Sequence, residues 1–266
     1  KTLLARLTAR LIDADFSRIQ FTPDLMPSDV LGTTVFNMKT NEFDFHKGPI
    51  FADIVLVDEI NRAPAKTQSA LFEVMEERQI SIDGTTHRMG ELYTILATQN
   101  PVEQEGTYKL PEAQLDRFLM KLTMDYPSLD EEVNILERHH SNAALVKLDD
   151  ITPALTKEEL LTLRAFMKNV FVDRTLLQYI ALIVQQTRTS KAVYLGASPR
   201  ASVAMMQASK AYALLQGRDF VTPEDIKFVA PYVLQHRLIL TAEAEMEGYS
   251  PVKVTQRLID KVEVPK

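Results

Sequence analysis

Hydrophobic and polar positions change their period along this chain. Apolar residues recur at spacings of three and four over residues 3–12, which predicts an amphipathic helix at the very start. Residues 16–21 read as a short strand, and residues 53–57 predict another, whose apolar run at residues 54–57 is typical of the middle of a parallel sheet. Residues 93–100 and 118–124 predict two more strands. Strands that alternate with helices indicate a doubly wound parallel α/β sheet.

Two segments between these strands predict β-hairpins. One lies between residues 33 and 47, and the other surrounds the Asp-Gly pair at residues 83–84, which is a strong turn signal. Three aromatic residues of the first hairpin leave two interpretations open. Phe36, Phe43 and Phe45 either pack the base of the hairpin as ordinary core or present an apolar tip to a substrate.

The second half of the chain has only helical patterns. Helix-capping signals open several of its apolar segments, at Ser128, Thr156, Ser198 and Thr222. The sequence therefore predicts an α/β domain over residues 1–126, followed by an all-helical domain over residues 127–266.

Composition narrows the classes of function. The 266 residues include no cysteine, which excludes a disulfide framework, thiolate zinc sites and thiol catalysis, and fits a cytoplasmic location. No apolar run approaches the roughly 20 residues of a membrane span. The net charge is −6, and residues 1–126 hold 13 basic against 19 acidic side chains. This balance argues against charge-driven binding of nucleic acid.

Two adjacent carboxylates, Asp58 and Glu59, follow the apolar run at residues 54–57. The backbone turns at the end of a strand, so both side chains can line the crevice at the carboxyl edge of a parallel sheet. One carboxylate can then hold a hydrated Mg²⁺ while the other polarises an attacking water. The plainer alternative is a solvated start of a loop.

The first two residues, Lys1 and Thr2, resemble the end of a phosphate-binding loop, G-x-x-x-x-G-K-[ST]. In such a loop the lysine reaches the β- and γ-phosphates, and the threonine hydroxyl ligates Mg²⁺. The glycines of the loop and the strand that should precede it are not in this sequence. We therefore expect the chain to begin inside a longer protein.

Five stretches, in order along almost the whole chain, resemble the MoxR family of AAA+ ATPases. They are SRIQFTPDLMPSD, GPIFADIVLVDEINRAPAKTQSALFEVMEERQI, ATQNPVEQEGTYKLPEAQLDRF, GASPRAS and VLQHRLIL. The resemblance implies a P-loop NTPase fold with a C-terminal helical lid, and it implies ATP and Mg²⁺ as ligands. By position, the hairpin at residues 33–47 matches the insert that some AAA+ proteins carry before Walker B.

The resemblance also implies roles for the four polar residues already described. Lys1 and Thr2 match the end of Walker A. Asp58 and Glu59 match Walker B, with Asp58 directed to Mg²⁺ and Glu59 as the base that orients the lytic water.

Three more residues match motifs of the family. Asn100 matches sensor 1, Arg117 matches the arginine finger that enters a neighbouring subunit's site, and Arg200 matches sensor 2, acting in cis or in trans. Plainer alternatives stay open for each. Asn100 can be a turn former, Arg117 can pair with Asp116, and Arg200 can be a solvated residue at a helix end.

As a whole, the resemblance implies an ATP-hydrolysing ring, a homo-oligomer that we expect to be a hexamer. The expected use is to remodel or mature partner proteins, often ones with a von Willebrand factor A domain. Two alternatives remain: a nucleotide-gated scaffold without turnover, and a magnesium-chelatase-type or nucleic-acid-remodelling motor. The last would favour basic hairpin tips, but Lys39 and Lys47 are offset by Glu42 and Asp44, so nucleic acid is not an expected partner.

Overall fold

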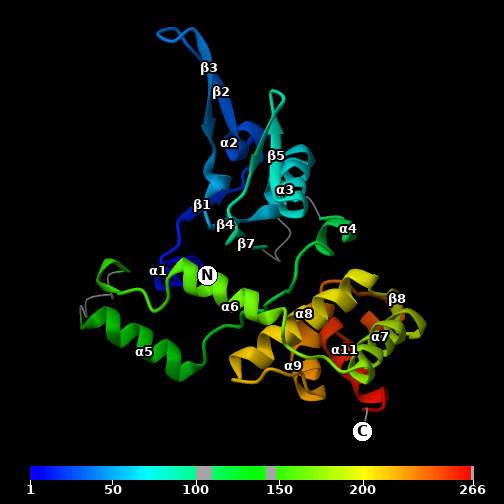
Figure 1. Ribbon diagram of the computed structural model, residues 1–266. Helices are drawn as coiled ribbons and strands as arrows, with labels where there is room; N and C mark the ends of the chain where they lie inside the picture. The colour runs from blue at the N-terminus through cyan, green and yellow to red at the C-terminus, as the bar shows by residue number, and fades with distance from the viewer. Residues whose placement is uncertain (100–109, 142–147, 265–266) are drawn as a thin grey trace. The chain divides into compact units, whose positions relative to one another are not determined.

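The computed structural model describes residues 1–99, 110–141 and 148–264 (Figure 1). The chain forms two compact units that interleave along the sequence. The sheet unit comprises Lys1–Leu110 and Tyr126–Thr162, and the helical unit comprises Pro111–Asp125 and Leu163–Lys266. The division into domains at residue 126 stays a prediction. None of the described helices has the length and apolar character needed to cross a bilayer.

A parallel sheet of three strands forms the centre of the sheet unit. β4 (Ile54–Asp58) lies between β1 (Phe16–Gln20) and β7 (Thr94–Ala97) and is parallel to both. All five residues of β4 are buried, as expected for a strand covered on both faces. In register, Gln20 lies opposite Asp58, so the carboxyl ends of β1 and β4 are level.

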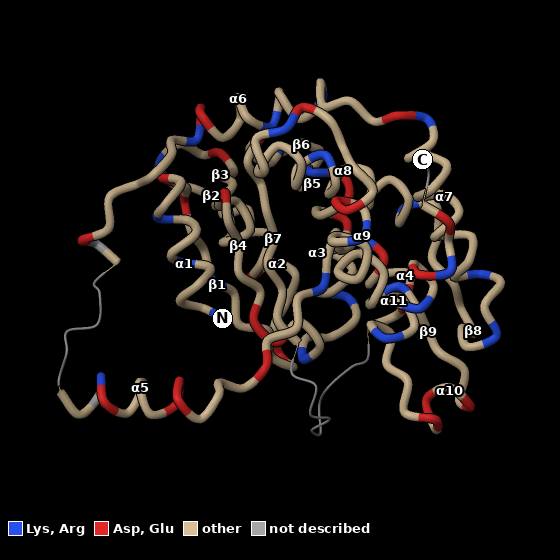
Figure 2. Tube along the Cα trace, turned by 90° about the horizontal axis from the view of Figure 1, so that it is seen from below, with Lys and Arg blue, Asp and Glu red and all other residues tan. Residues whose placement is uncertain are grey.

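Helix α1 (Thr2–Leu11) leads directly into β1 and packs against β4. It therefore runs back along the sheet, and the N-terminus of the chain lies towards the carboxyl ends of the strands (Figure 2). The helix forms as predicted, but its buried residues are Ala5 and Ala9, whereas Leu3 and Leu4 are exposed. Small side chains let this helix lie close to the sheet.

The other helices and turns of the sheet unit are shorter or lie outside the sheet's centre. They are α2 (Pro27–Leu31), η1 (Pro49–Phe51), η2 (Ile60–Arg62), α3 (Ala65–Glu77), α5 (Leu129–His140), η3 (Leu148–Asp150) and the first part of α6 (Lys157–Met167). The capping signals predicted at Ser128 and Thr156 are confirmed. Ser128 Oγ accepts a hydrogen bond from Glu131 N at 3.4 Å, and Thr156 Oγ1 accepts one from Glu159 N at 3.2 Å.

Both predicted hairpins form. β2 (Gly32–Asn37) pairs with β3 (Glu42–Lys47), and β5 (Gln79–Ile82) pairs with β6 (Thr85–Arg88). Asp83 and Gly84 have φ values of 50° and 78°, the left-handed pair that a tight two-residue hairpin turn requires.

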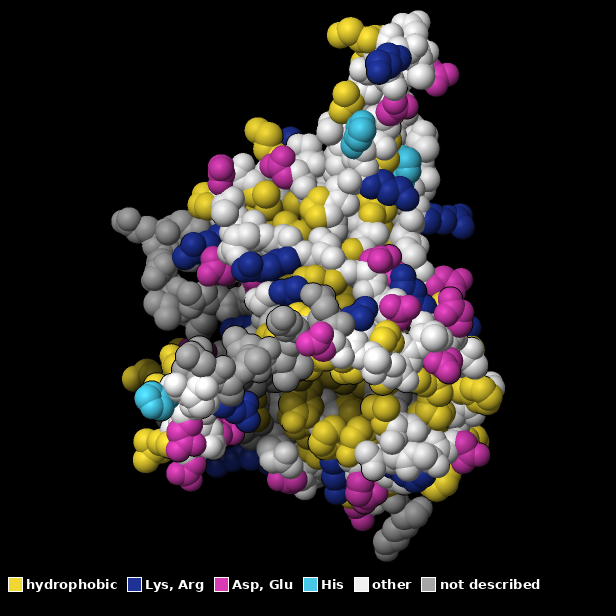
Figure 3. All heavy atoms as spheres, turned by 90° about the vertical axis from the view of Figure 1, so that its left-hand side faces the viewer, with side chains coloured by type: hydrophobic (Ala, Val, Ile, Leu, Met, Phe, Trp, Pro, Cys, Tyr) yellow, Lys and Arg dark blue, Asp and Glu magenta, His cyan; other side chains and the backbone are white. Residues whose placement is uncertain are grey.

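The aromatic residues of the β2–β3 hairpin do not all behave alike: one packs the base of the hairpin as core, and two are exposed. The Phe45 ring lies 4.3 Å from the His87 ring and 5.9 Å from the Phe51 ring, so it packs the base. Phe36 and Phe43 touch each other, with ring centroids 5.1 Å apart, yet they are 45% and 73% exposed. Figure 3 shows hydrophobic side chains on the projecting hairpin.

The strand predicted over residues 118–124 does not form, and the prediction is wrong there. This segment bends at residues 118–119 and has no regular secondary structure over residues 120–124. It belongs to the helical unit, where Lys121 N donates to Tyr232 O at 2.9 Å and Gln235 Nε2 donates to Lys121 O at 2.5 Å. A short apolar run reads the same whether it joins a sheet or lies along helices.

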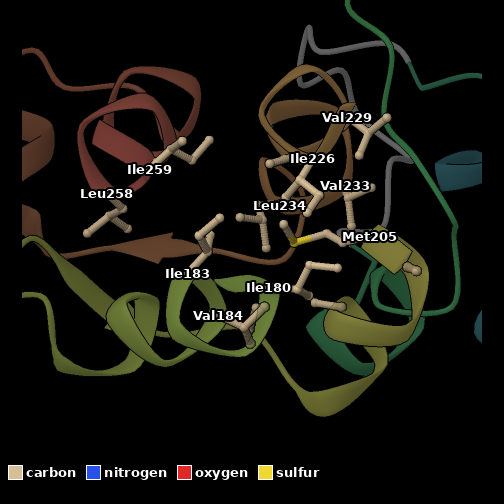
Figure 4. Close-up of a cluster of buried hydrophobic side chains, with 14 of the residues drawn as sticks. Ile180, Ile183, Val184, Met205, Ile226, Val229, Val233, Leu234, Leu258 and Ile259 are labelled. Atoms are coloured by element: carbon tan, nitrogen blue, oxygen red, sulfur yellow. The ribbon is translucent and has the colours of Figure 1, made fainter. Parts of the chain in front are cut away.

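The helical unit is built around four long helices. They are α7 (Arg174–Thr189), α8 (Pro199–Leu215), α9 (Pro223–Leu234) and α11 (Pro251–Lys261), accompanied by α4 (Glu112–Leu115), α10 (Ala242–Met246) and the short antiparallel pair β8 (Val193–Leu195) and β9 (Ile239–Leu240). Their apolar faces meet in one core, where Ile183, Met205 and Leu234 point towards one another (Figure 4). The caps predicted at Ser198 and Thr222 are confirmed.

Shortening Ile183 to Ala is expected to lower the free energy of unfolding of this unit by about 2–5 kcal/mol. Ile183 is 0% exposed and lies in the core, so the substitution removes buried apolar surface and leaves a cavity. Leu182, next to it on α7 but 45% exposed, is the matched control, and Leu182→Ala should cost clearly less. Urea unfolding of the three proteins measures the difference, and equal losses would contradict the placement of the core.

Candidate active site

Asp58 ends β4 as a buried carboxylate held from both neighbouring strands. Its Oδ2 accepts a hydrogen bond from Arg18 Nε on β1 at 2.6 Å, and its Oδ1 accepts one from Thr98 Oγ1, directly after β7, at 3.1 Å. The carboxyl ends of all three strands therefore meet at this side chain. This is the edge at which an open parallel sheet places its ligands.

Glu59 follows in a left-handed backbone conformation, with φ 56° and ψ 49°. A residue other than glycine adopts this conformation at a cost of about 1–2 kcal/mol, and such strain is typical of functional sites. Thr98 Oγ1 accepts a hydrogen bond from Glu59 N at 3.0 Å. The sharp turn keeps Glu59 at the strand end beside Asp58, which agrees with the crevice interpretation of the two carboxylates.

The Glu59 side chain has two partners of its own. Its Oε2 accepts a hydrogen bond from Gln20 Nε2 at 3.0 Å and pairs with Arg62 Nε at 3.1 Å. Both contacts hold the carboxylate at the carboxyl edge of the sheet, where Gln20 ends β1.

Sequence reasoning did not single out Arg18, Gln20, Arg62 or Thr98. The sequence could have indicated Arg18 and Gln20, because they are two positions apart on β1 and therefore share one face of the strand. Their polar character on that face fits the carboxylates of the adjacent strand. Thr98 could not be chosen from the polar end of its strand without the pairing of β7 with β4.

The structure places Lys1 and Thr2 on the first turn of α1, at the same end of the sheet as Asp58 and Glu59. Lys1 is the N-cap and is exposed, and its carbonyl accepts the hydrogen bond from Ala5 N at 3.1 Å. The start of a helix offers unpaired N–H groups and a partial positive charge, which favour a phosphate group.

The remaining predicted residues are not among the described residues of the sheet unit. Asn100 lies outside the described residues. Arg117 and Arg200 belong to the helical unit, where Arg117 is half-buried after α4 and Arg200 is exposed on the first turn of α8. Within that unit the two arginines are linked through one carboxylate. Asp116 Oδ2 accepts a hydrogen bond from Ser198 Oγ at 2.7 Å, and Ser198 Oγ in turn accepts one from Arg200 N at 3.1 Å.

His236 is a buried neutral histidine beside the Arg117 segment. Its Nε2 lies 3.0 Å from Phe118 O, so this nitrogen carries the proton, and Nδ1 is a buried lone pair without a hydrogen-bond partner among the described residues. Burial, aided by the nearby charges of Arg237 and Lys121, lowers the pKa of His236 from its ordinary 6.5 to about 4, although Asp116 opposes the shift.

The protein is expected to lose up to about 3 kcal/mol of stability as the pH falls from 6.5 to 4, because in this window the unfolded chain binds a proton at His236 that the folded chain does not. His236→Gln, which does not titrate, should lose this part of the slope. Denaturant unfolding at pH 7, 6 and 5 compares the two proteins, and identical slopes would contradict a neutral buried His236.

Two aspartates affect the stability only at more acidic pH. Burial alone would raise the pKa values of Asp53 and Asp225, but hydrogen bonds to Lys157 and Arg218 outweigh it and lower both below 3.8.

Comparison with known protein families agrees with this geometry. The family described as "ATPase family associated with various cellular activities (AAA)" matches residues 1–120, and the "AAA lid domain" matches residues 185–260. The two matches correspond to the region that carries the carboxylates and to most of the helical unit.

Individual relatives extend the match to the whole chain. The uncharacterized protein YeaC of Bacillus subtilis is 49% identical over 265 residues, which cover 100% of this chain and 82% of the relative. Chaperone MoxR1 of Mycobacterium tuberculosis is 44% identical over 280 residues, which cover 100% and 72%. A crystal structure of a protein from Cytophaga hutchinsonii assigned as an ATPase is 41% identical, with a TM-score of 0.91, and the match covers 100% of this chain and 82% of that one. The chain therefore belongs to the MoxR family of AAA+ ATPases.

Proposed function

We propose that this protein hydrolyses ATP at the carboxyl edge of its parallel sheet and uses the energy to remodel partner proteins. The observation that carries the proposal is the joint placement of Asp58 and Glu59, which are held side by side by residues from both flanking strands. A strained backbone at the second carboxylate is easier to explain by chemistry than by stability, because a glycine would fit the turn without strain.

In this proposal each carboxylate has its own task. Glu59 orients the attacking water and accepts its proton, since a carboxylate is the usual group for that step in phosphoryl transfer. Lys1 binds the β- and γ-phosphates at the start of α1. Asn100, which matches sensor 1 in the sequence, would hold the water or the γ-phosphate.

The chemistry at Asp58 suits Mg²⁺. The ion takes oxygen ligands, often from one or two carboxylates while it keeps several waters. Arg18 and Thr98 each donate one hydrogen bond to Asp58, and the carboxylate keeps further lone pairs for a metal-bound water. Among the residues described, no cluster of three or more acidic, histidine or cysteine side chains offers another metal site. Asp58 and Thr2 would hold the ion, which neutralises phosphate charge when bound.

We further propose that the active form is a homo-oligomeric ring, a hexamer, in the cytoplasm. Arg117 has a role in hydrolysis only if it reaches the nucleotide of a neighbouring subunit, as an arginine finger does. Arg200 would contact the phosphates as sensor 2. The name of the relative MoxR1 as a chaperone supports partner proteins as clients, and partners with a von Willebrand factor A domain are the first to test.

Steady-state ATP hydrolysis by the full chain, measured over a range of protein concentrations, tests the proposal. Specific activity that rises steeply with concentration would support sites shared between subunits. Tight ATP binding without turnover at any concentration would leave the nucleotide-gated scaffold as the function. If the protein does turn over ATP, adding a candidate client should change the rate of hydrolysis, because the proposal couples hydrolysis to remodelling.

A further inference from the structure

The guanidinium of Arg237 is enclosed by the chain segment that carries Arg117. The Arg237 side chain is only 3% exposed. Its Nε donates to Asp116 Oδ1 at 2.8 Å, and its Nη2 donates to Asp116 O at 3.2 Å and to Phe118 O at 2.5 Å. Its Nη1 donates to Leu119 O at 3.2 Å and to Val233 O on α9. The bonds equal in number the five N–H donors that a guanidinium has.

Arg117 lies between two of the residues that Arg237 holds. The carbonyls of Asp116 and Phe118 both accept hydrogen bonds from the same Nη2, so the main chain is fixed on each side of Arg117. A main-chain bond from Lys121 N to Tyr232 O at 2.9 Å fixes the segment again a few residues later. The position of the Arg117 backbone is therefore set by the helical unit.

The Asp116 carboxylate extends this anchor to α8. Its Oδ1 binds Arg237, while its Oδ2 binds Ser198 Oγ, the cap that accepts the Arg200 backbone N–H. The residues proposed as finger and as sensor 2, Arg117 and Arg200, thus have their backbones attached to one ion pair, between the buried Arg237 and the half-buried Asp116.

We propose that Arg237 is a positioning residue for ATP hydrolysis, which fixes the Arg117 segment so that its guanidinium reaches the nucleotide of the neighbouring subunit. The inference rests on the proposed function, because it assumes that Arg117 acts in trans. It explains why an arginine occupies this buried position. A lysine ammonium is a point charge with three donors and cannot reproduce the planar fork that binds four carbonyls and a carboxylate.

Arg237→Lys in the full chain is expected to lower kcat for ATP by about 10²-fold, the effect of misplacing a catalytic group by roughly 1 Å. KM for ATP should change little, because Arg117 acts on the transition state of a site in another subunit. Arg257→Lys is the matched control. Arg257 is exposed on α11 and lies over the Tyr249 ring, so this variant should keep normal activity.

Mixed rings separate positioning from a general loss of structure. Arg237→Lys subunits keep an intact site but present a misplaced finger, whereas Glu59→Gln subunits have a dead site and a normal finger. An equimolar mixture should therefore recover turnover that neither protein shows alone. The pair Arg117→Ala with Glu59→Gln serves as the reference for complementation.

Recovery in both mixtures supports the proposal. Recovery in the reference but not with Arg237→Lys overturns it while leaving the proposed function intact. No recovery in the reference means that sites are not shared, which overturns both. If Arg237→Lys does not fold, as judged by its thermal unfolding, Asp116→Asn enters the same mixture. It keeps the shape of the carboxylate but weakens the bond to Arg237, and the same outcomes decide.

Discussion

Replacing Glu59 with Gln is expected to lower kcat for ATP hydrolysis by about 10²–10⁴-fold. Glutamine keeps the size of the side chain and an oxygen that can accept the hydrogen bond from Gln20 Nε2, but it cannot take a proton from the attacking water. The affinity for ATP should stay close to that of the unchanged protein, since the role proposed for Glu59 concerns the water rather than the nucleotide. Steady-state kinetics and equilibrium binding of a fluorescent ATP analogue measure the two quantities.

Glu73→Gln is the matched control for this substitution. Glu73 is exposed on α3, so losing its charge should leave kcat unchanged. Normal turnover by Glu59→Gln would remove Glu59 as the base and with it the main support for the proposed site. A loss of nucleotide binding with the same substitution would instead show that Glu59 contributes to the ground state.

Replacing Arg117 with Ala is expected to lower kcat by about 10³–10⁵-fold, the range measured for arginine fingers. The guanidinium would neutralise charge that develops on the transferred phosphoryl group, and alanine offers no replacement. If Arg117 acts at the site of a neighbouring subunit, as proposed, ATP binding and ring assembly should remain. Size-exclusion chromatography with light scattering follows assembly, and single-turnover hydrolysis follows the chemical step.

Arg174→Ala provides the control for this loss of charge, since Arg174 is exposed at the start of α7 and its removal should not affect turnover. The alternative in which Arg117 serves only its own chain makes a different prediction. In that case Arg117→Ala would lower stability, and mixing with Glu59→Gln would restore nothing.

Much of the fold could be predicted because local patterns and long-range packing agree. β4 is apolar at each position before Asp58 and lies in the centre of the sheet, and Asp83-Gly84 turns its hairpin as expected. The prediction of a strand at residues 118–124 was wrong because its local pattern and its long-range packing disagree. Its partners, such as Tyr232 and Gln235, are more than 100 residues away, and no local pattern indicates them.

In the site, too, residues marked by a local pattern could be predicted, and residues brought in by long-range pairing could not. Asp58 and Glu59 could be identified because they are adjacent and end an apolar run. The residues that hold them, Arg18 and Thr98, are 40 residues away from Asp58 on either side, and become neighbours only through the pairing of three strands. Periodicity can place a residue on a face, but it cannot tell which partner lies across from it.

The interleaving of the two compact units has a consequence for the order of events during synthesis. Arg117 leaves the ribosome 120 residues before Arg237, a delay of roughly 6–24 seconds at typical elongation rates. Until then the carboxylate of Asp116 lacks the guanidinium of Arg237. The contacts between the Arg117 segment and Arg237 therefore form only after α9 has been made, late in the synthesis of the helical unit. If Arg117 has the proposed role at a neighbouring subunit's site, incomplete chains would not contribute a working finger.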